Sequence, residues 1–279
     1  MTWFNYNGKI FTEGIPVIGT GNRSLRYGDG LFETMKIKKG ALILGNEHFA
    51  RLWKGLQVLQ FDIPKHFTPQ KLQEAILQLA AKNKQEQAAR VRLTVFRGDG
   101  GLYDAAHHHP DYIIQTWALA DDNAALNSNG LDLGIYYDAK KSCDILSNLK
   151  TNNFLPYAMA ALEVKKQQWN DAVLLNNHGR VCDSTIANIF LIKEGVVFTP
   201  SLAEGCIEGV LRNYILQQLE ANHISCREKE ITVEALLQAD EVFLSNSIYN
   251  MRWVKSIGNK TYSNTITQKI YSLLSPTIL

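Results

Sequence analysis

Two different spacings of apolar residues follow each other within the first 120 residues. Between Asn46 and Leu59 the apolar side chains fall on one helical stripe, and Thr68 opens a second helical segment. Residues 89–97 instead alternate in the manner of a strand, and residues 111–118 are the expected partner. The pattern predicts a mixed α/β unit in which the two helices cover one face of a sheet. Further short strands are expected at residues 3–6, 9–11, 17–18 and 31–37.

A polar stretch at residues 121–130 interrupts this pattern and is the best candidate for a linker between domains. We therefore expect an N-terminal α/β domain at residues 1–120 and a C-terminal domain at residues 131–279. The second domain is expected to combine both kinds of element. Its strands are predicted at 131–137, 172–176, at Val181 with 187–192, 196–198 and 241–244, and its helices at 155–169, from 209 onward and at 233–238.

The charge balance and the cysteine content narrow the possible partners. The chain has 29 basic and 27 acidic residues, a net charge of +2, and no basic stripe that would bind a nucleic acid. The four cysteines lack C-x-x-C spacing and the three consecutive histidines at 107–109 diverge, so we expect no metal site. No secretory leader and no long apolar run are visible, and we expect a cytoplasmic protein without a membrane partner.

Lys150 lies in a polar junction, Ser147–Pro156, directly before a predicted helix. Lysines usually occupy solvated helix faces, whereas a lysine amine held in a fixed loop can act as a nucleophile toward an aldehyde. A turn lysine without any chemical role has the same pattern, and Lys140 and Lys141 lie close by in the sequence. Spacing alone leaves both interpretations open.

Three other places contain groups that could bind an anion. In Gly205–Arg212 a glycine-containing loop leads into a helix, whose free backbone N–H groups could hold a phosphate, although an ordinary loop has the same pattern. Arg90 and Arg92 share one strand face, which indicates either carboxylate recognition or solvent exposure. His48 and Arg51 lie three residues apart on one helical face, and Arg51 points either toward a site or into solvent.

Taken together, these segments resemble the class IV, or fold-type IV, enzymes that depend on pyridoxal 5′-phosphate (PLP). That family includes branched-chain and D-amino acid aminotransferases and 4-amino-4-deoxychorismate lyases. The resemblance spans nearly the whole chain and implies a smaller N-terminal α/β domain and a larger C-terminal, β-barrel-like domain with helices. The motifs that carry it, in order, are Tyr27–Thr34, His48–Leu52, Leu149–Asn153, Ala187–Phe190, Thr199–Pro200, Gly209–Arg212 and Ala239–Phe243.

The resemblance also implies roles for individual residues. Lys150 would hold PLP as a Schiff base and carry the proton between the α-carbon of the substrate and the cofactor. The other cofactor contacts would come from Arg51, Asp183, Val210, Leu211 and Ser247, and the substrate contacts from Tyr27, Phe32 and Arg92.

Asp183 departs from the family pattern, which has a glutamate against the pyridine nitrogen at this place. A carboxylate there keeps the nitrogen protonated, so that the ring can accept electrons. Because aspartate is one methylene shorter, either the strand or the ring shifts, or a water molecule bridges the gap.

The cofactor residues do not separate the reactions of the family. We expect an aminotransferase that moves an amino group between an amino acid and a 2-oxo acid, similar to the branched-chain group and acting as a homodimer. The main alternative is a 4-amino-4-deoxychorismate lyase that releases pyruvate and 4-aminobenzoate. Phe154 stands where branched-chain enzymes carry a tyrosine and favours the lyase, whereas Gly100–Tyr103 lacks the arginine that lyases often have. A non-catalytic binding protein on the same scaffold is the remote alternative.

Overall fold

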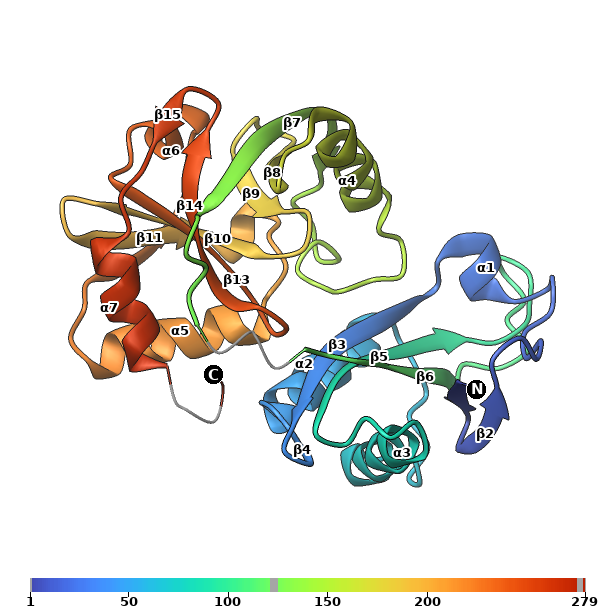
Figure 1. Cartoon of the computed structure of the whole chain (residues 1–279). Coiled ribbons are helices and arrows are strands. Elements are labelled where there is room, and N and C mark those ends of the chain that lie inside the picture. Colours follow the sequence, from blue (N-terminus) through green and yellow to red (C-terminus); the bar gives the residue numbers. More distant parts are fainter. Residues whose placement is uncertain (1, 121–124, 275–277, 279) are drawn as a thin grey trace. The chain divides into compact units, whose positions relative to one another are not determined.

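A computed structural model describes residues 2–120, 125–274 and 278 (Figure 1). Residues 121–124 of the expected linker lie outside the described residues. The chain divides into two compact units, one formed by Met1–Asp121 and Leu149–Asn153, the other by Asp122–Asn148 and Phe154–Leu279. The segment that contains Lys150 therefore belongs to the first unit, although residues of the second unit flank it on both sides.

The described residues of the first unit form a six-stranded antiparallel sheet in the order β2-β1-β6-β5-β3-β4. Its helices are α1, α2 and α3, and α2 and α3 lie on the same side of the sheet (Figure 1). The strands are β1 (Trp3–Tyr6), β2 (Lys9–Thr12), β3 (Gly30–Lys38), β4 (Ala41–Leu42), β5 (Ala88–Arg97) and β6 (Pro110–Ala118), and the helices are α1 (Arg23–Tyr27), α2 (Gly45–Val58) and α3 (Pro69–Lys82).

The core of this unit lies between the sheet and the two long helices. Leu52 and Leu56 of α2 and Ile76 of α3 pack in one cluster with the inward side chains of β3 and β5. Helix α3 begins where expected, because the hydroxyl of Thr68 accepts a hydrogen bond from the backbone N–H of Lys71. The prediction that two helices cover one face of the sheet is confirmed.

One local prediction for the first unit was wrong, and one helix was not predicted. Residues 17–18 do not form a strand, and residues 23–27 form the short helix α1. The side chain of Asn22 caps α1 by accepting from the N–H of Ser24, and Gly28 ends the helix with a φ of 67°. A five-residue helix is too short for an apolar stripe, so its end residues are its main sequence signal.

The described residues of the second unit form a nine-stranded sheet, in the order β12-β11-β10-β13-β14-β7-β8-β9 with β15 paired to β14. Figure 1 shows this sheet as strongly curled. Its strands are β7 (Leu131–Lys141), β8 (Asp171–Asn176), β9 (Val181–Ser184), β10 (Asn188–Lys193), β11 (Val196–Pro200), β12 (Cys226–Lys229), β13 (Glu241–Asn246), β14 (Asn250–Ile257) and β15 (Lys260–Thr261). Its helices are α4 (Leu155–Gln167), the 3-10 helix η2 (Leu202–Glu204), α5 (Val210–Ala221), α6 (Val233–Leu237) and α7 (Thr265–Leu273).

The two faces of this curled sheet contact different clusters. One face packs the apolar cluster that includes Val173, Leu191 and Leu244, and the other packs a cluster with Tyr157 and Ile207. Helix α4 packs against β7 and β8, whereas α5 and α7 pack against β13. Both faces of the central strands are therefore covered, as their continuous apolar sequences require.

The mixed α/β architecture predicted from the sequence is confirmed. The last predicted element of the second domain was the strand at 241–244, and no regular structure was predicted between residue 244 and residue 279. Strands β14 and β15 and helix α7 follow there, and β12 was also missed. No described helix combines the length and the apolar character needed to cross a bilayer.

Candidate active site

Gly30 allows the segment with Lys150 to lie directly against strand β3. The N–H of Phe32 donates to the carbonyl of Lys150 at 2.8 Å, and the N–H of Asn152 donates to the carbonyl of Gly30 at 2.9 Å. A Cβ atom at position 30 would lie 2.5 Å from the side-chain Nδ2 of Asn152 in this segment and would collide with the carbonyl oxygen of Val95 in β5. The glycine is therefore required by close packing, and it lets backbone hydrogen bonds fix the lysine.

Lys150, Phe32 and Arg92 come together on one face of the first sheet. The Nζ of Lys150 lies 4.6 Å from the centre of the Phe32 ring, and the guanidinium of Arg92 lies 3.8 Å from it. Phe32 is buried, and the Nε of Arg92 donates to the hydroxyl of Thr94 at 3.2 Å. One aromatic ring thus has an amine and a guanidinium beside it, a combination that can receive an aldehyde and a carboxylate.

Arg51 lies on the opposite, helix-covered side of β3 and holds a buried carboxylate there. Its Nε donates to Oε1 of Glu33 at 2.8 Å, and its NH2 group lies 2.5 Å from Oε2. His48 places its Nδ1 2.7 Å from the same Oε2. The structure therefore confirms that His48 and Arg51 share a helix face, but their common partner Glu33 was missed by the sequence analysis.

The protonation of this cluster follows from its burial. Burial alone would raise the pKa of Glu33, but Arg51 and the hydrogen bond with His48 outweigh burial and lower that pKa to about 2. Burial lowers the pKa of His48. The Nε2 atom of His48 is buried without a hydrogen-bond partner among the described residues, so the neutral ring with its proton on Nδ1 fits best. The charged pair is thus Glu33 and Arg51.

Tyr27 is the last residue of α1, and its ring contacts differ from those that join Lys150, Phe32 and Arg92. Its ring has the guanidinium groups of Arg23 and Arg26 at 5.3 and 5.2 Å, and 37% of the residue is exposed. Of the three predicted substrate residues, the structure therefore joins Phe32 and Arg92 with Lys150, whereas Tyr27 contacts arginines of its own helix.

In the second unit, Asp183 lies at the centre of a buried polar cluster. Its Oδ2 accepts from the hydroxyl of Tyr157 at 2.6 Å, the N–H of Ile207 at 3.0 Å and the Nζ of Lys141 at 3.2 Å. Its Oδ1 accepts from the amide of Asn188 at 3.0 Å. A carboxylate oxygen has two lone pairs, so Oδ1 retains a position for a further donor.

An irregular register in β9 places Asp183 and Val181 on opposite faces of the sheet. Asp183 is opposite Leu174, and Val181 is opposite Leu175, so one extra residue lies on the β9 side. Val181 and Ser184 consequently face one side of the sheet, and Asp183 between them faces the other. The simple alternation of a strand would not have given this orientation.

Lys141 is the second residue that the sequence analysis missed. Its ammonium also donates to the carbonyl groups of Gly205 at 2.6 Å and Ser147 at 3.3 Å. Burial alone would lower the pKa of Lys141, but the neighbouring Asp183 carboxylate raises it above the ordinary value. A strand lysine flanked by other polar residues gives no sequence signal for burial, and Lys140, its exposed neighbour, looks the same in the sequence.

The start of helix α5 provides the third group of predicted residues. Gly209 precedes the helix with extended backbone angles, and no side chain caps the helix. A Cβ at position 209 would collide with the Oδ1 of Asn188, so the glycine again permits close packing. Val210 and Leu211 are buried at this helix start, and Ser247 lies partly exposed in the turn between β13 and β14.

Comparison with known proteins identifies the family and supports the fold. The family model for class IV aminotransferases, "Amino-transferase class IV", matches residues 30–257. An aminodeoxychorismate lyase of Vibrio harveyi is 30% identical, over 89% of this chain and 91% of its own, and a D-alanine aminotransferase of Bacillus licheniformis is 25% identical, over 98% and 96%. The structure of the branched-chain amino acid aminotransferase of Escherichia coli superposes with a TM-score of 0.85 at 23% identity, over 96% of this chain and 91% of the other.

The chain belongs to the class IV aminotransferase family. It is accordingly an enzyme, and its cofactor is PLP. The residues present fit that group: the uncapped start of α5 suits a phosphate, and Oδ1 of Asp183 has one acceptor position left for a ring N–H.

Proposed function

We propose that the enzyme transfers an amino group between a small amino acid and a 2-oxo acid, with Lys150 as the catalytic residue. The observation that supports this most is the arrangement of Lys150 and Arg92 on either side of the Phe32 ring. PLP supplies an aldehyde that condenses with amines and a ring that accepts electrons from the substrate α-carbon.

The chain's own groups then divide the work. The Nζ of Lys150 binds the aldehyde and afterwards carries a proton to and from the α-carbon. Arg92 receives the substrate carboxylate, because its guanidinium lies beside the same ring as the amine. Phe32 and Tyr27 provide aromatic surface and exclude water from the reacting atoms.

The remaining predicted residues hold the cofactor in this proposal. The backbone N–H groups of Val210 and Leu211 and the hydroxyl of Ser247 bind the phosphate. The family resemblance assigns the guanidinium of Arg51 to it as well, although Glu33 holds that guanidinium on the helix-covered side of β3. Glu33 restrains Arg51 by contacting its guanidinium with both carboxylate oxygens. Asp183 uses Oδ1 for the ring nitrogen, while its Oδ2 keeps the three protein donors.

A second reaction, lyase cleavage of 4-amino-4-deoxychorismate, is favoured by a separate observation. The relative with 30% identity bears the lyase name, whereas the D-alanine aminotransferase has 25%. Both reactions begin with removal of the substrate α-proton, and the arrangement of Lys150, Phe32 and Arg92 serves either.

The decisive experiment compares products from the purified holoenzyme. One reaction contains a branched-chain amino acid with 2-oxoglutarate, and the other contains 4-amino-4-deoxychorismate. Glutamate formation in the first supports the aminotransferase, and formation of pyruvate and 4-aminobenzoate in the second reaction alone contradicts it. Lys150→Ala should abolish both activities and also the absorption near the blue edge of the visible range. Lys140→Ala should retain the activity and the absorption of the unmodified enzyme.

The quaternary structure and location complete the proposal. The enzyme acts as a homodimer, as the family resemblance implies, and in the cytoplasm, as the spacing of its four cysteines favours. Light scattering of the active holoenzyme tests the first point, because an active monomer would contradict it.

A further inference from the structure

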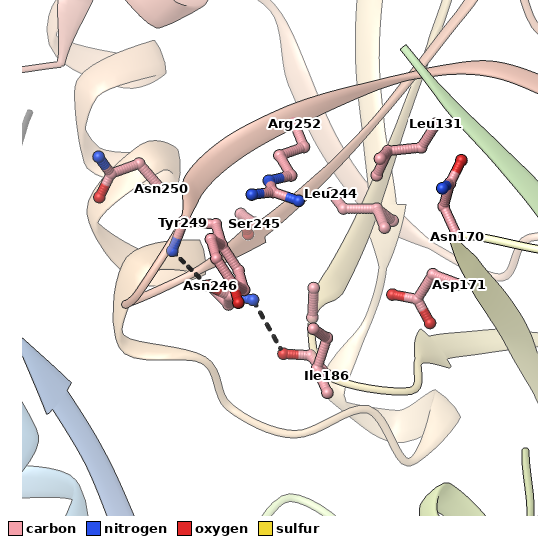
Figure 2. Close-up of a pocket in the computed structure, with 11 residues that line it drawn as sticks. Leu131, Asn170, Asp171, Ile186, Leu244, Ser245, Asn246, Tyr249, Asn250 and Arg252 are labelled. Carbon is pink, nitrogen blue, oxygen red and sulfur yellow. Dashed lines mark hydrogen bonds between the residues drawn. The ribbon is translucent and has the colours of Figure 1, made fainter. Parts of the chain in front are cut away.

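The second unit contains a cavity of about 120 Å³ that the proposed function does not use (Figure 2). Its walls come from the beginnings of β7, β8 and β14, the end of β13 and the segment before β10. One water molecule needs only roughly 10–15 Å³ measured in this way, so a small organic molecule fits.

The cavity lies on the other face of the sheet from Asp183. Arg252 pairs in register with Leu244, and Leu244 belongs to the apolar cluster on the face that Val173 and Leu191 share. Asp171 pairs with Leu133 of the same cluster. Asp183 instead faces the cluster of Tyr157 and Ile207. The cavity is therefore distinct from the polar cluster proposed for the cofactor ring.

Arg252 contributes a cation to this cavity without a matching anion. Its guanidinium stacks 3.9 Å from the centre of the Tyr249 ring, and no described carboxylate forms an ion pair with it. In Figure 2 its side chain extends from β14 between Leu244 and Tyr249. Stacking of this kind fixes the guanidinium but leaves its edge for hydrogen bonds with a carboxylate.

Asp171 contributes an anion to the same cavity, again without an ion pair among the described residues. It is 4% exposed, and burial raises its pKa. Hydrogen bonds from the N–H of Ala172 and from the N–H and hydroxyl of Thr185 end on its Oδ1, and the hydroxyl of Ser184 also donates to the carboxylate. The carboxylate thus has hydrogen-bond donors but no cation among the described residues, and a buried carboxylate without a counter-ion is costly.

We propose that this cavity is a second binding site for a small zwitterionic amino acid, with its carboxylate on Arg252 and its ammonium group on Asp171. Two opposite charges that line one cavity without pairing with each other are matched by a ligand that carries both charges. The amide of Asn246 lies at the wall, where it donates to the carbonyl of Ile186 at 3.3 Å and fixes the rim of the cavity. Such a site would sense the amino-acid concentration separately from turnover.

Calorimetric titration of L-alanine into the holoenzyme tests this site. The holoenzyme is first treated with borohydride, which makes the bond between the lysine and the cofactor permanent and so blocks the reaction site. We expect saturable binding with one site per chain. Arg252→Met should raise the Kd at least tenfold, whereas Arg227→Met, at an exposed arginine of β12, should leave it unchanged. An equal Kd in Arg252→Met, or no binding at all, would overturn the proposal.

A second test needs no variant and compares ligands that lack one of the two charges of an amino acid. Propionate lacks the ammonium group and ethylamine lacks the carboxylate, and each should bind at least tenfold more weakly than L-alanine. Binding of propionate as tight as that of L-alanine would contradict the role of Asp171. Absence of amino-group transfer in the product assay would refute the proposed function alone, because the calorimetric readout does not involve turnover.

Discussion

The ammonium of Lys141 lies 3.2 Å from the carboxylate of Asp183, and both side chains are buried. Asp183 raises the pKa of the Lys141 ammonium above its ordinary value, so the ammonium keeps its charge beside the carboxylate. The pair therefore fixes the charge and the position of Asp183 before any ligand binds.

Removing one partner of this pair should destabilise the enzyme strongly. Lys141→Met leaves an uncompensated buried carboxylate, and we expect the free energy of unfolding to fall by about 3–5 kcal/mol. Lys140→Met, at the exposed neighbour, should change it by less than about 0.5 kcal/mol. Urea unfolding of both variants is the measurement, and equal stabilities would show that Lys141 does not support Asp183.

The pair of Glu33 and Arg51 should make the stability of the enzyme sensitive to acid. The pKa of Glu33 is lowered from 4.5 to about 2 in the folded chain, so its contribution is present above pH 4.5 and is lost as the pH falls toward 2. The shift corresponds to about 3 kcal/mol. In Glu33→Gln the unfolding free energy should fall less steeply between pH 4.5 and 2, whereas Glu74→Gln, at an exposed residue of α3, should follow the unmodified enzyme. An unchanged slope in Glu33→Gln would refute this assignment.

Gly30→Ala should displace the segment that contains Lys150. The added Cβ would lie 2.5 Å from the side-chain Nδ2 of Asn152 in that segment, and backbone atoms of Val95 and Phe96 in β5 prevent it from moving away. We expect a loss of about 1–3 kcal/mol in unfolding free energy, together with a weaker visible absorption band of the holoenzyme. Gly19→Ala is the matched control, because no atom of the described residues lies within 4 Å of the added Cβ. A fully coloured and stable Gly30→Ala enzyme would show that the strand and the segment can separate without cost.

Arg92→Met tests recognition of the substrate carboxylate. Loss of a hydrogen-bonded charge pair should raise KM for the amino acid by about 10- to 100-fold, with a smaller effect on kcat. Arg90→Met changes an exposed residue of the same strand, which stacks on Trp117, and should leave KM unaltered. A change confined to kcat would place Arg92 among groups that act only in the transition state.

The sequence predicted those features that depend on periodicity and on motif order. Helices α2 and α3, strand β5 and the grouping of Lys150 with Phe32 and Arg92 agree with the structure, because each depends on local spacing or on the family motifs. The C-terminal elements were missed because β14 mixes polar and apolar residues without alternation, with Trp253 and Arg252 partly exposed.

The partners of Asp183 and Glu33 could not have been predicted from spacing. Lys141 is 42 residues from Asp183 in the sequence, and Glu33 is 15 from His48. Such pairs are set by strand register and by helix packing, and a single sequence records neither. Asn188, five residues beyond Asp183, is the exception, because it belongs to a motif that the family resemblance already included.

The extra residue in β9 has a consequence for how this protein can vary. Within four residues the strand supplies an apolar side chain to one face of the sheet and an acid to the other, and the irregular pairing is what separates the two. Regular pairing of the same four residues would place Val181 and Asp183 on one face and bring a hydrocarbon side chain into the polar cluster of Asp183. Variants that keep both residues should therefore also keep the irregular pairing.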